Sequence, residues 1–324
     1  MLFYRCTGTF TDPVSEEYRD AVRGAHILLI LQEVNVMKKI LVALLTLTMV
    51  CGLAACGSSS SGDSSSAEAT TQAAAAQSDL ADKDTWIVAI NATFPPFESV
   101  SDESTDSYVG IDIDIANEIG ERLGKTIEFS DMQFSALVPT MESGRADMII
   151  SGISPTEERK ETLDFTKSYY FPMNSVVCLK GKGYSSLDDL KGLKLAQSMG
   201  TSYAELAKTV EGAEVTELDN TPLVIQEILA GRADAGIFDA SQAAEFVQQN
   251  DGIESNLIAA DMTMEDTFAI ALPKGSEYVE KINTVLDEME ADGTLHEIFV
   301  KYLGEDTVAE YEEMIADLDI AQQQ

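Results

Sequence analysis

The stretch GRADMII at residues 144–150 decides how the folded part of this sequence is built, because it returns as GRADAGIF at residues 231–238. In both copies a helical pattern precedes the glycine and an apolar run follows the aspartate. Glycine can adopt the left-handed backbone that ends a helix, and a short apolar run is typical of a buried strand. The repeat therefore predicts one helix–strand unit that is used twice, in two similar α/β lobes.

Helix and strand patterns alternate around both copies. An apolar run at residues 86–90 precedes a helical pattern, and Thr221-Pro222 marks the start of the helix before the second copy. Such alternation predicts mostly parallel sheets flanked by helices. We expect lobe 1 at residues 84–178 and 268–304 and lobe 2 at residues 179–267, joined by two crossover strands at 174–179 and 267–272. We expect residues 305–324 to be an acidic, helix-prone tail at the periphery.

The first 83 residues carry a different pattern. Lys38-Lys39 precedes an apolar run at residues 40–53 that is shorter than the roughly 20 residues needed to span a bilayer. This is typical of a secretory signal peptide, and the small residues before Cys56 resemble a bacterial lipobox, in which Cys56 would be lipidated. We expect residues 1–36 to be a mis-annotated upstream extension, 37–56 the signal peptide, and 57–83 a flexible Ser/Ala-rich linker.

Charge and cysteine content narrow the function. The chain has 21 Lys and Arg against 56 Asp and Glu, a net charge of −35, which opposes binding to nucleic acid. Only Cys178 of the four cysteines falls in the predicted fold, so no disulfide is expected there. Cys178 lies in an apolar run and is predicted to be a small buried hydrophobe. The sequence shows no metal-ligand pattern and no phosphate-binding glycine motif, and we expect no cofactor.

Polar and aromatic side chains cluster where the predicted strands end, which is where ligands bind in open α/β sheets. The candidates for ligand binding are Asn91, Phe94, Phe134, Ser151, Gly152, Ser154, Arg159, Thr201, Ser202 and Asp239. Arg159 could hold a carboxylate with its guanidinium fork, and Asp239 could accept from an ammonium group. Each also has a plainer interpretation: Arg159 as a structural ion pair, Asp239 as a helix N-cap, and the phenylalanines as core. Together they suit the two charged ends of a free amino acid.

Several stretches together resemble the family 3 extracellular solute-binding proteins. They are NATFPPFE at residues 91–98, VGIDID at 109–114, residues 147–159, DFTKSYY at 164–170, GTS at 200–202, and residues 231–239. The resemblance covers residues 86–303 and implies a type II two-lobed periplasmic-binding-protein fold. It implies the substrate-binding component of an ABC importer, which closes on a free polar L-amino acid by a hinge motion. The implied partners are permease and ATPase subunits, and with the lipid anchor the expected place is the extracytoplasmic face of the cell membrane. We expect a monomer.

The resemblance also assigns roles to the candidates. It implies that Arg159 binds the ligand carboxylate together with the turn at Thr201 and Ser202, and that Asp239 binds the ammonium. It implies that Gly152 and Ser154 contact these ends from lobe 1, with Phe94 and Phe134 as aromatic walls. One position departs from the pattern: several relatives that bind cationic or amide side chains carry aspartate where this chain has Asn91. That departure leans away from a strict binder of Lys, Arg or His, although another acid such as Asp131 could substitute, so the ligand side chain stays open.

Two other functions are compatible with this fold. An enzyme related to periplasmic dehydratases is disfavoured because the predicted mature part has a single histidine, His296, with no nucleophile paired to it in the sequence. Turnover of candidate substrates would separate this function from binding. A sensor co-receptor is the other alternative, and no signalling module is expected after Leu303. The presence or absence of permease and ATPase genes beside this gene would decide between transport and sensing.

Overall fold

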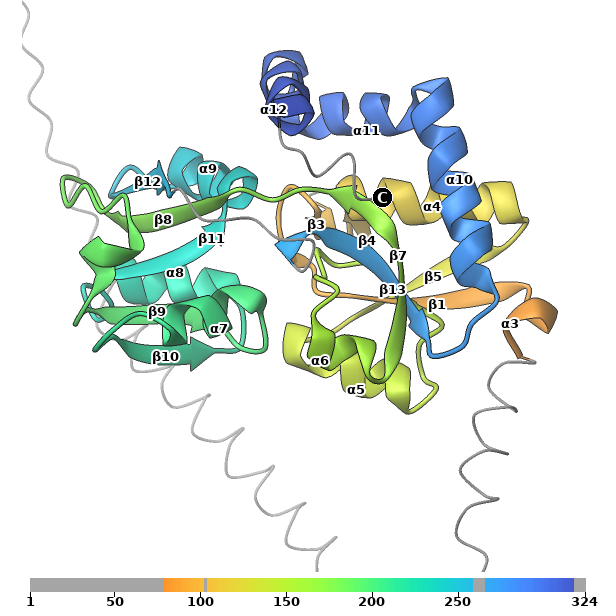
Figure 1. Ribbon diagram of the computed structural model, residues 1–324, viewed down its shortest axis with the longest axis horizontal. Helices are drawn as coiled ribbons and strands as arrows, with labels where there is room; N and C mark the ends of the chain where they lie inside the picture. The colour runs from red at the N-terminus through yellow and green to blue at the C-terminus, as the bar shows by residue number, and fades with distance from the viewer. Residues whose placement is uncertain (1–78, 102–103, 259–265, 318–324) are drawn as a thin grey trace, which may run out of the picture. The chain divides into compact units, whose positions relative to one another are not determined.

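The computed structural model describes residues 79–101, 104–258 and 266–317 (Figure 1). The predicted upstream extension, the signal peptide with Cys56, and residues 57–78 of the predicted linker lie outside the described residues. Within that linker, helix α3 (Asp79–Asp82) buries Leu80, whose carbonyl oxygen accepts a hydrogen bond from Nε1 of Trp86 at 3.3 Å. The folded part therefore includes residues that we assigned to the linker.

The first sheet has five strands. In spatial order they are β5 (Thr126–Asp131), β1 (Thr85–Ile90), β6 (Met148–Ile149), β13 (Phe268–Pro273) and β7 (Leu163–Tyr170). Strand β1 runs parallel to β5 and β6, whereas β13 runs antiparallel to β6 and β7. Side chains alternate between the two faces of a strand, and β1 follows this rule. Trp86, Val88 and Ile90 join one hydrophobic cluster and Ala89 joins another.

Helices cover both faces of this sheet. The cluster on one face takes residues from α4 (Ile111–Leu123), α10 (Tyr278–Asp292) and α11 (Thr294–Leu303). The cluster on the other face takes Leu137 and Met141 from α5 (Leu137–Glu142), which follows the 3-10 turn η1 (Phe134–Ala136). A three-stranded antiparallel sheet of β2 (Thr93–Phe94), β3 (Glu98–Ser101) and β4 (Ser104–Val109) and a short helix α6 (Glu157–Lys160) complete this lobe.

The second sheet repeats this arrangement. Its order is β10 (Glu214–Leu218), β9 (Lys194–Ser198), β11 (Ala235–Asp239), β8 (Asn174–Leu179) and β12 (Ile253–Leu257). Again two parallel pairings are followed by two antiparallel ones. Helices α8 (Thr221–Leu229) and α9 (Ala240–Gln249) cover one face (Figure 1). The other face is covered by α7 (Ser202–Lys208) and by the 3-10 turn η2 (Leu187–Leu190). Cys178 is fully buried in the latter cluster, as predicted.

The repeated GRAD stretch has the same role in both sheets, which confirms the prediction of two similar lobes. The first glycine of each copy has a left-handed φ, 70° and 68°. Asp147 then exchanges two hydrogen bonds with Ile87 on the neighbouring strand: its N–H donates at 2.8 Å and its Oδ2 accepts at 2.9 Å. Asp234 makes the same pair with Lys194, at 2.7 and 3.0 Å. Each aspartate therefore fixes the register of the central strand.

Two details of the predicted fold are wrong. The sheets are mixed rather than mostly parallel, and the two predicted crossover strands at 174–179 and 267–272 are β8 and β13, ladder strands of the two sheets. Parallel neighbours need a crossover connection such as a helix. Strands β8 and β13 instead enter their sheets directly from the other lobe, and both run antiparallel to the central strand. The first passage between the sheets therefore lies in the short segment 171–173, before β8.

We predicted that the C-terminal segment would be peripheral, and for its described residues, 305–317, this prediction is wrong. Helix α12 (Glu305–Asp317) buries Val308 and Tyr311 in the main hydrophobic cluster. The Tyr311 ring stacks on Tyr170 with centroids 4.9 Å apart, and its hydroxyl accepts a hydrogen bond from the N–H of Phe171 at 2.9 Å. We predicted a peripheral tail from the acidic composition and overlooked an apolar stripe at helical spacing. This stripe packs on the main hydrophobic cluster.

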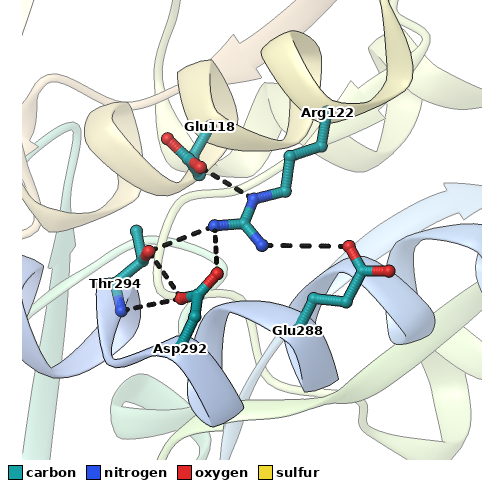
Figure 2. A network of polar contacts seen from close by, with 5 residues as sticks. All are labelled: Glu118, Arg122, Glu288, Asp292 and Thr294. Carbon is teal, nitrogen blue, oxygen red and sulfur yellow. Dashed lines mark hydrogen bonds and ion pairs between the residues drawn. The ribbon is translucent and has the colours of Figure 1, made fainter.

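Arg122 forms ion pairs and a hydrogen bond with residues of three helices of the first lobe, α4, α10 and α11 (Figure 2). Its Nε atom lies 2.7 Å from Oε1 of Glu118 on the same helix, α4. Its terminal nitrogens lie 2.9 Å from Asp292 at the end of α10, 3.8 Å from Glu288, and 3.1 Å from the Thr294 hydroxyl at the start of α11. Charge networks of this kind stabilise more than isolated surface pairs.

Candidate binding site

A pocket lies between residues of the two lobes, with about 510 Å³ of empty space when its open mouth is counted. Nine of the ten predicted residues line it. The lining consists of Asn91, Phe94, Phe134, Ser151, Gly152, Ser154, Arg159, Gln197, Ser198, Thr201, Ser202, Tyr203, Thr221, Ile237, Phe238 and Gln242. Asp239 is the predicted residue that does not line the pocket.

Several of these residues occupy strand ends, as expected for an α/β sheet, and others lie at the starts of helices. Asn91 follows β1 and Ser151 follows β6, while Ser198 is the last residue of β9. These strands run parallel within their sheets, so their carboxyl ends meet at one edge of each sheet. The arrangement explains how residues far apart in sequence converge on one pocket.

Arg159 provides the positive charge of the pocket. One terminal nitrogen donates to the carbonyl oxygen of Ser154 in the first lobe at 2.8 Å, and the other donates to that of Gly200 in the second lobe at 2.9 Å. Its Cζ atom lies 5.5 Å from the centre of the Phe134 ring. Burial lowers the pKa of Arg159 to about 10, so the guanidinium remains charged at neutral pH. No carboxylate of the described residues pairs with it at ion-pair distance.

The pocket side of lobe 1 rests on two buried carboxyl groups that we did not predict. Ser151 donates its hydroxyl to Oε1 of Glu98 and accepts the N–H of Asn91 at 3.0 Å. Asp112 accepts the N–H of Gly152 at 2.8 Å. Glu98 and Asp112 are both completely buried, and burial is the main cause that raises the pKa of Asp112 to about 6. The pKa of Glu98 is raised well above its usual value by burial and then by the neighbouring Asp112.

Gly152 cannot be replaced without moving the pocket wall. Its φ is +53°, a backbone conformation that side chains rarely adopt. A Cβ atom at this position would lie 2.3 Å from Cε1 of Phe94. The absence of a side chain therefore lets Phe94 cover the main chain at the end of β6.

The second lobe contributes a helix start. Thr201 is the N-cap of α7, and its Oγ1 accepts the N–H of Ala204 at 3.1 Å. The hydroxyl of Ser202 lies 3.5 Å from that of Ser154, so hydroxyl groups of the two lobes face each other across the pocket.

Asp239 sits behind the lining, between Phe238 and the helix that carries Gln242. Its Oδ1 accepts the N–H of Gln242 at 3.0 Å as the N-cap of α9, which is the plainer of the two roles considered from sequence. Its Oδ2 has no hydrogen-bond partner among the residues that the structure describes, although the side chain is completely buried. Burial raises the pKa of Asp239 to about 7.

Sequence reasoning missed seven lining residues: Gln197, Ser198, Tyr203, Thr221, Ile237, Phe238 and Gln242. Several of them follow the rule that we used elsewhere, since Gln197 and Ser198 end β9 and Phe238 lies at the end of β11. Gln242 and Tyr203 lie in the first turns of helices, and only the three-dimensional arrangement brings these turns to the pocket. In the described ranges, no group of three or more His, Cys, Asp or Glu residues could hold a metal ion. No described helix has the length and apolarity needed to cross a membrane.

Two mixed sheets flanked by helices, with a polar pocket at their strand ends, define a two-lobed solute-binding protein of the periplasmic-binding-protein type. Residues 86–305 match the profile of the bacterial extracellular solute-binding proteins, family 3. The chain therefore belongs to this family.

Individual relatives agree with this assignment. The arginine-binding extracellular protein ArtP of Bacillus subtilis is 32% identical over 67% of this chain and 85% of its own length. The L-cystine-binding protein TcyJ of Escherichia coli K12 is 28% identical over 69% of this chain and 85% of its own. Among solved structures, an ancestral arginine-binding protein bound to glutamine is 37% identical, with a TM-score of 0.64 over 69% of this chain and 99% of that one.

Proposed function

We propose that the pocket binds a free polar L-amino acid by its two charged ends, and that the protein hands this ligand to an ABC transporter as its substrate-binding component. The observation that carries the proposal is a pocket lined by a guanidinium, that of Arg159, with no carboxylate partner among the described residues, and backed by the buried carboxyl group of Asp239, whose Oδ2 has no hydrogen-bond partner among those residues. Buried charges without partners are costly, so a ligand that supplies both opposite charges is favoured.

The carboxylate end of the ligand belongs at Arg159. A guanidinium donates two parallel hydrogen bonds to a carboxylate, and the two carbonyl oxygens that Arg159 contacts leave further donors available. The hydroxyls of Ser154 and Ser202, which face each other at 3.5 Å, are placed to add hydrogen bonds from both lobes.

The ammonium end belongs at Asp239. Oδ2 of Asp239 is a buried acceptor without a partner in the described part of the chain, and an ammonium group has only donors to offer. Binding of the ammonium would return the Asp239 carboxyl to its ionised form. The wall at Gly152, Phe94 and Phe134 then covers the rest of the ligand.

Family membership supports a transport role. The relatives cited above are named as amino-acid-binding proteins, and a further solved structure, that of AbpA from Streptococcus pneumoniae, is named as an amino acid ABC transporter substrate-binding protein. The partners are accordingly permease and ATPase subunits, which recognise the form that is closed on its ligand. Closure by a hinge at segment 171–173 would bring the two lobes onto the ligand and exclude water.

The place of the protein is proposed from its N-terminal sequence. Lipidation of Cys56, which would become the new N-terminus once the residues before it are removed, would anchor the chain at the extracytoplasmic face of the membrane, with the segment before α3 as tether and the folded part as a monomer. The two alternatives, a sensor co-receptor and a dehydratase-like enzyme, gain no specific observation from the pocket.

A thermal-shift screen of the twenty amino acids tests the function directly. We expect at least one amino acid to raise the melting temperature with a concentration dependence that fits one site, because a ligand that binds only the folded state stabilises it. Isothermal titration would confirm the stoichiometry. No shift and no heat with any amino acid would contradict the proposal, and turnover of a bound substrate would favour an enzyme instead.

A further inference from the structure

We infer that the pocket selects amino acids whose side chain is uncharged and carries a hydrogen-bond acceptor, and that Gln242 is the residue that selects it. This inference rests on the proposed function, because it assigns Arg159 and Asp239 to the two ends of the ligand. It concerns the part of the pocket that is then left for the ligand side chain.

The charges in the pocket balance without a charged side chain. Arg159 is the only lining residue with a formal charge, and Asp239 lies directly behind the lining. A zwitterionic ligand uses both. A third charge, on the ligand side chain, would find no opposite charge in the lining, and a buried charge without a partner is strongly disfavoured.

The other nearby acids do not change this balance. Asp131, which could have substituted for the missing aspartate, is exposed, does not line the pocket, and accepts a main-chain N–H at 2.9 Å. The two oxygens of Asp112 accept the hydroxyl of Tyr169 and the N–H of Gly152, each at 2.8 Å. Glu98 is completely buried, accepts the hydroxyl of Ser151 and does not line the pocket.

Two polar groups of the lining have no partner within the described part of the chain. Gln242 is 2% exposed, and its Nε2 donates to nothing; the hydroxyl of Tyr203 is buried and equally unpaired. The other two amides of the lining are engaged. Asn91 donates to a main-chain carbonyl at 2.7 Å, and Gln197, in the orientation that satisfies both of its amide atoms, pairs with the N–H and carbonyl of one β11 residue at 2.7 and 3.0 Å.

An unpaired donor selects ligands by chemistry. A buried N–H without an acceptor destabilises the complex, and a ligand carbonyl or hydroxyl oxygen would satisfy it. Lysine and arginine side chains carry donors only and cannot do so. A site with unpaired buried groups discriminates strongly against ligands that lack the matching atom.

The aromatic walls do not offset this preference. The Phe134 ring already has the guanidinium of Arg159 5.5 Å from its centre, so a second cation there would meet a like charge. Phe94 stacks on Phe97 with centroids 4.8 Å apart, which covers one of its faces. The acidic exterior, with a net charge of −35, raises the encounter rate of cations but supplies no partner inside the pocket.

Paired ligands of nearly equal shape test the inference. Isothermal titration of the full chain with L-citrulline and L-arginine compares a neutral carbonyl with a cationic guanidinium, and L-glutamine with L-lysine provides a smaller pair. We expect the neutral member of the pair that binds more tightly to exceed its cationic counterpart at least tenfold in affinity.

The variant Gln242→Leu tests the residue. It removes the donor without adding charge, so the ratio of neutral to cationic affinity should fall at least fivefold, while the affinity for the cationic ligand changes little. Gln248→Leu is the matched control, because Gln248 is exposed on the same helix outside the pocket, and it should leave the ratio unchanged.

The outcomes distinguish a failure of the inferred side-chain selectivity from a failure of the proposed amino-acid binding. Tighter binding of arginine or lysine, or a preference for purely apolar amino acids, would overturn the inference and leave amino-acid binding standing. An unchanged ratio in Gln242→Leu would remove Gln242 as the selecting residue. Binding of none of the twenty amino acids and not of citrulline would overturn the proposed function itself.

Discussion

At the scale of single residues, the pocket depends on groups whose partners are incomplete. Arg159 reaches carbonyl oxygens of both lobes but no carboxylate of the described chain, and Asp239 leaves one oxygen unpaired in a completely buried position. The residue types and their places at strand ends were predictable from sequence. The incompleteness was not, because it depends on which side chains of the other lobe come near, and Asp239 was equally compatible with a helix cap.

Substitution of Arg159 tests the carboxylate end. We expect Arg159→Ala to weaken amino-acid binding by at least ~3 kcal/mol, because it would leave the ligand carboxylate buried without a partner. The affinity of Arg159→Lys should lie between those of the parent and Arg159→Ala, since lysine keeps the charge but loses the planar guanidinium fork. Titration calorimetry measures both, with the exposed Arg145→Ala as control. Unchanged affinity in Arg159→Ala would contradict the assignment.

Substitution of Asp239 tests the ammonium end. Asparagine still caps a helix, so Asp239→Asn should keep α9 intact while it removes the negative charge. We expect affinity for the amino acid to fall at least tenfold and the far-ultraviolet circular dichroism to stay unchanged. If the variant bound as tightly as the parent, Asp239 would be a cap and nothing more.

At the scale of secondary-structure elements, short sequence patterns gave the right elements but not all of their partners. The GRAD repeat correctly predicted a helix stop and a central strand in each lobe. Strands β8 and β13 were identified as extended segments and then misplaced as connectors, because pairing direction follows from where the chain comes from, which a local pattern does not encode. Helix α12 was predicted as helical, yet its acidic residues concealed the packing of Val308 and Tyr311.

Helix α12 should contribute measurably to stability. Tyr311→Ala removes a ring that stacks on Tyr170 and a hydroxyl that accepts the N–H of Phe171, so we expect a loss of about 3 kcal/mol in the free energy of unfolding. Tyr311→Phe removes only the hydroxyl and should cost about 1 kcal/mol. Denaturant titrations give both values. Equal stability of all three proteins would show that α12 does not pack on the core in solution.

At the scale of the whole molecule, three buried carboxyl groups link stability to pH. The pKa values of Asp112, Asp239 and Glu98 are all raised, mainly by burial, so the folded state binds protons more tightly than the unfolded state. The contribution of these groups to stability is therefore present at low pH and is lost as the pH rises through their folded-state pKa values, about 6 for Asp112 and about 7 for Asp239.

The ligand-free protein should show this dependence between about pH 4 and about pH 7. We expect the free energy of unfolding to fall with rising pH more steeply in the parent than in Asp239→Asn, which lacks one of the three groups. A saturating amino acid should flatten the dependence, because its ammonium favours the ionised form of Asp239. Denaturant titrations at a series of pH values provide the measurement, and identical slopes for parent and variant would contradict it.

A crystal structure of the protein with its amino acid bound tests the central claim most directly. The account predicts the ligand carboxylate within hydrogen-bond distance of the Arg159 guanidinium and the ligand ammonium on Oδ2 of Asp239, with both lobes in contact with the same molecule. A ligand bound elsewhere, or one seated in the pocket with neither end on these two groups, would contradict it.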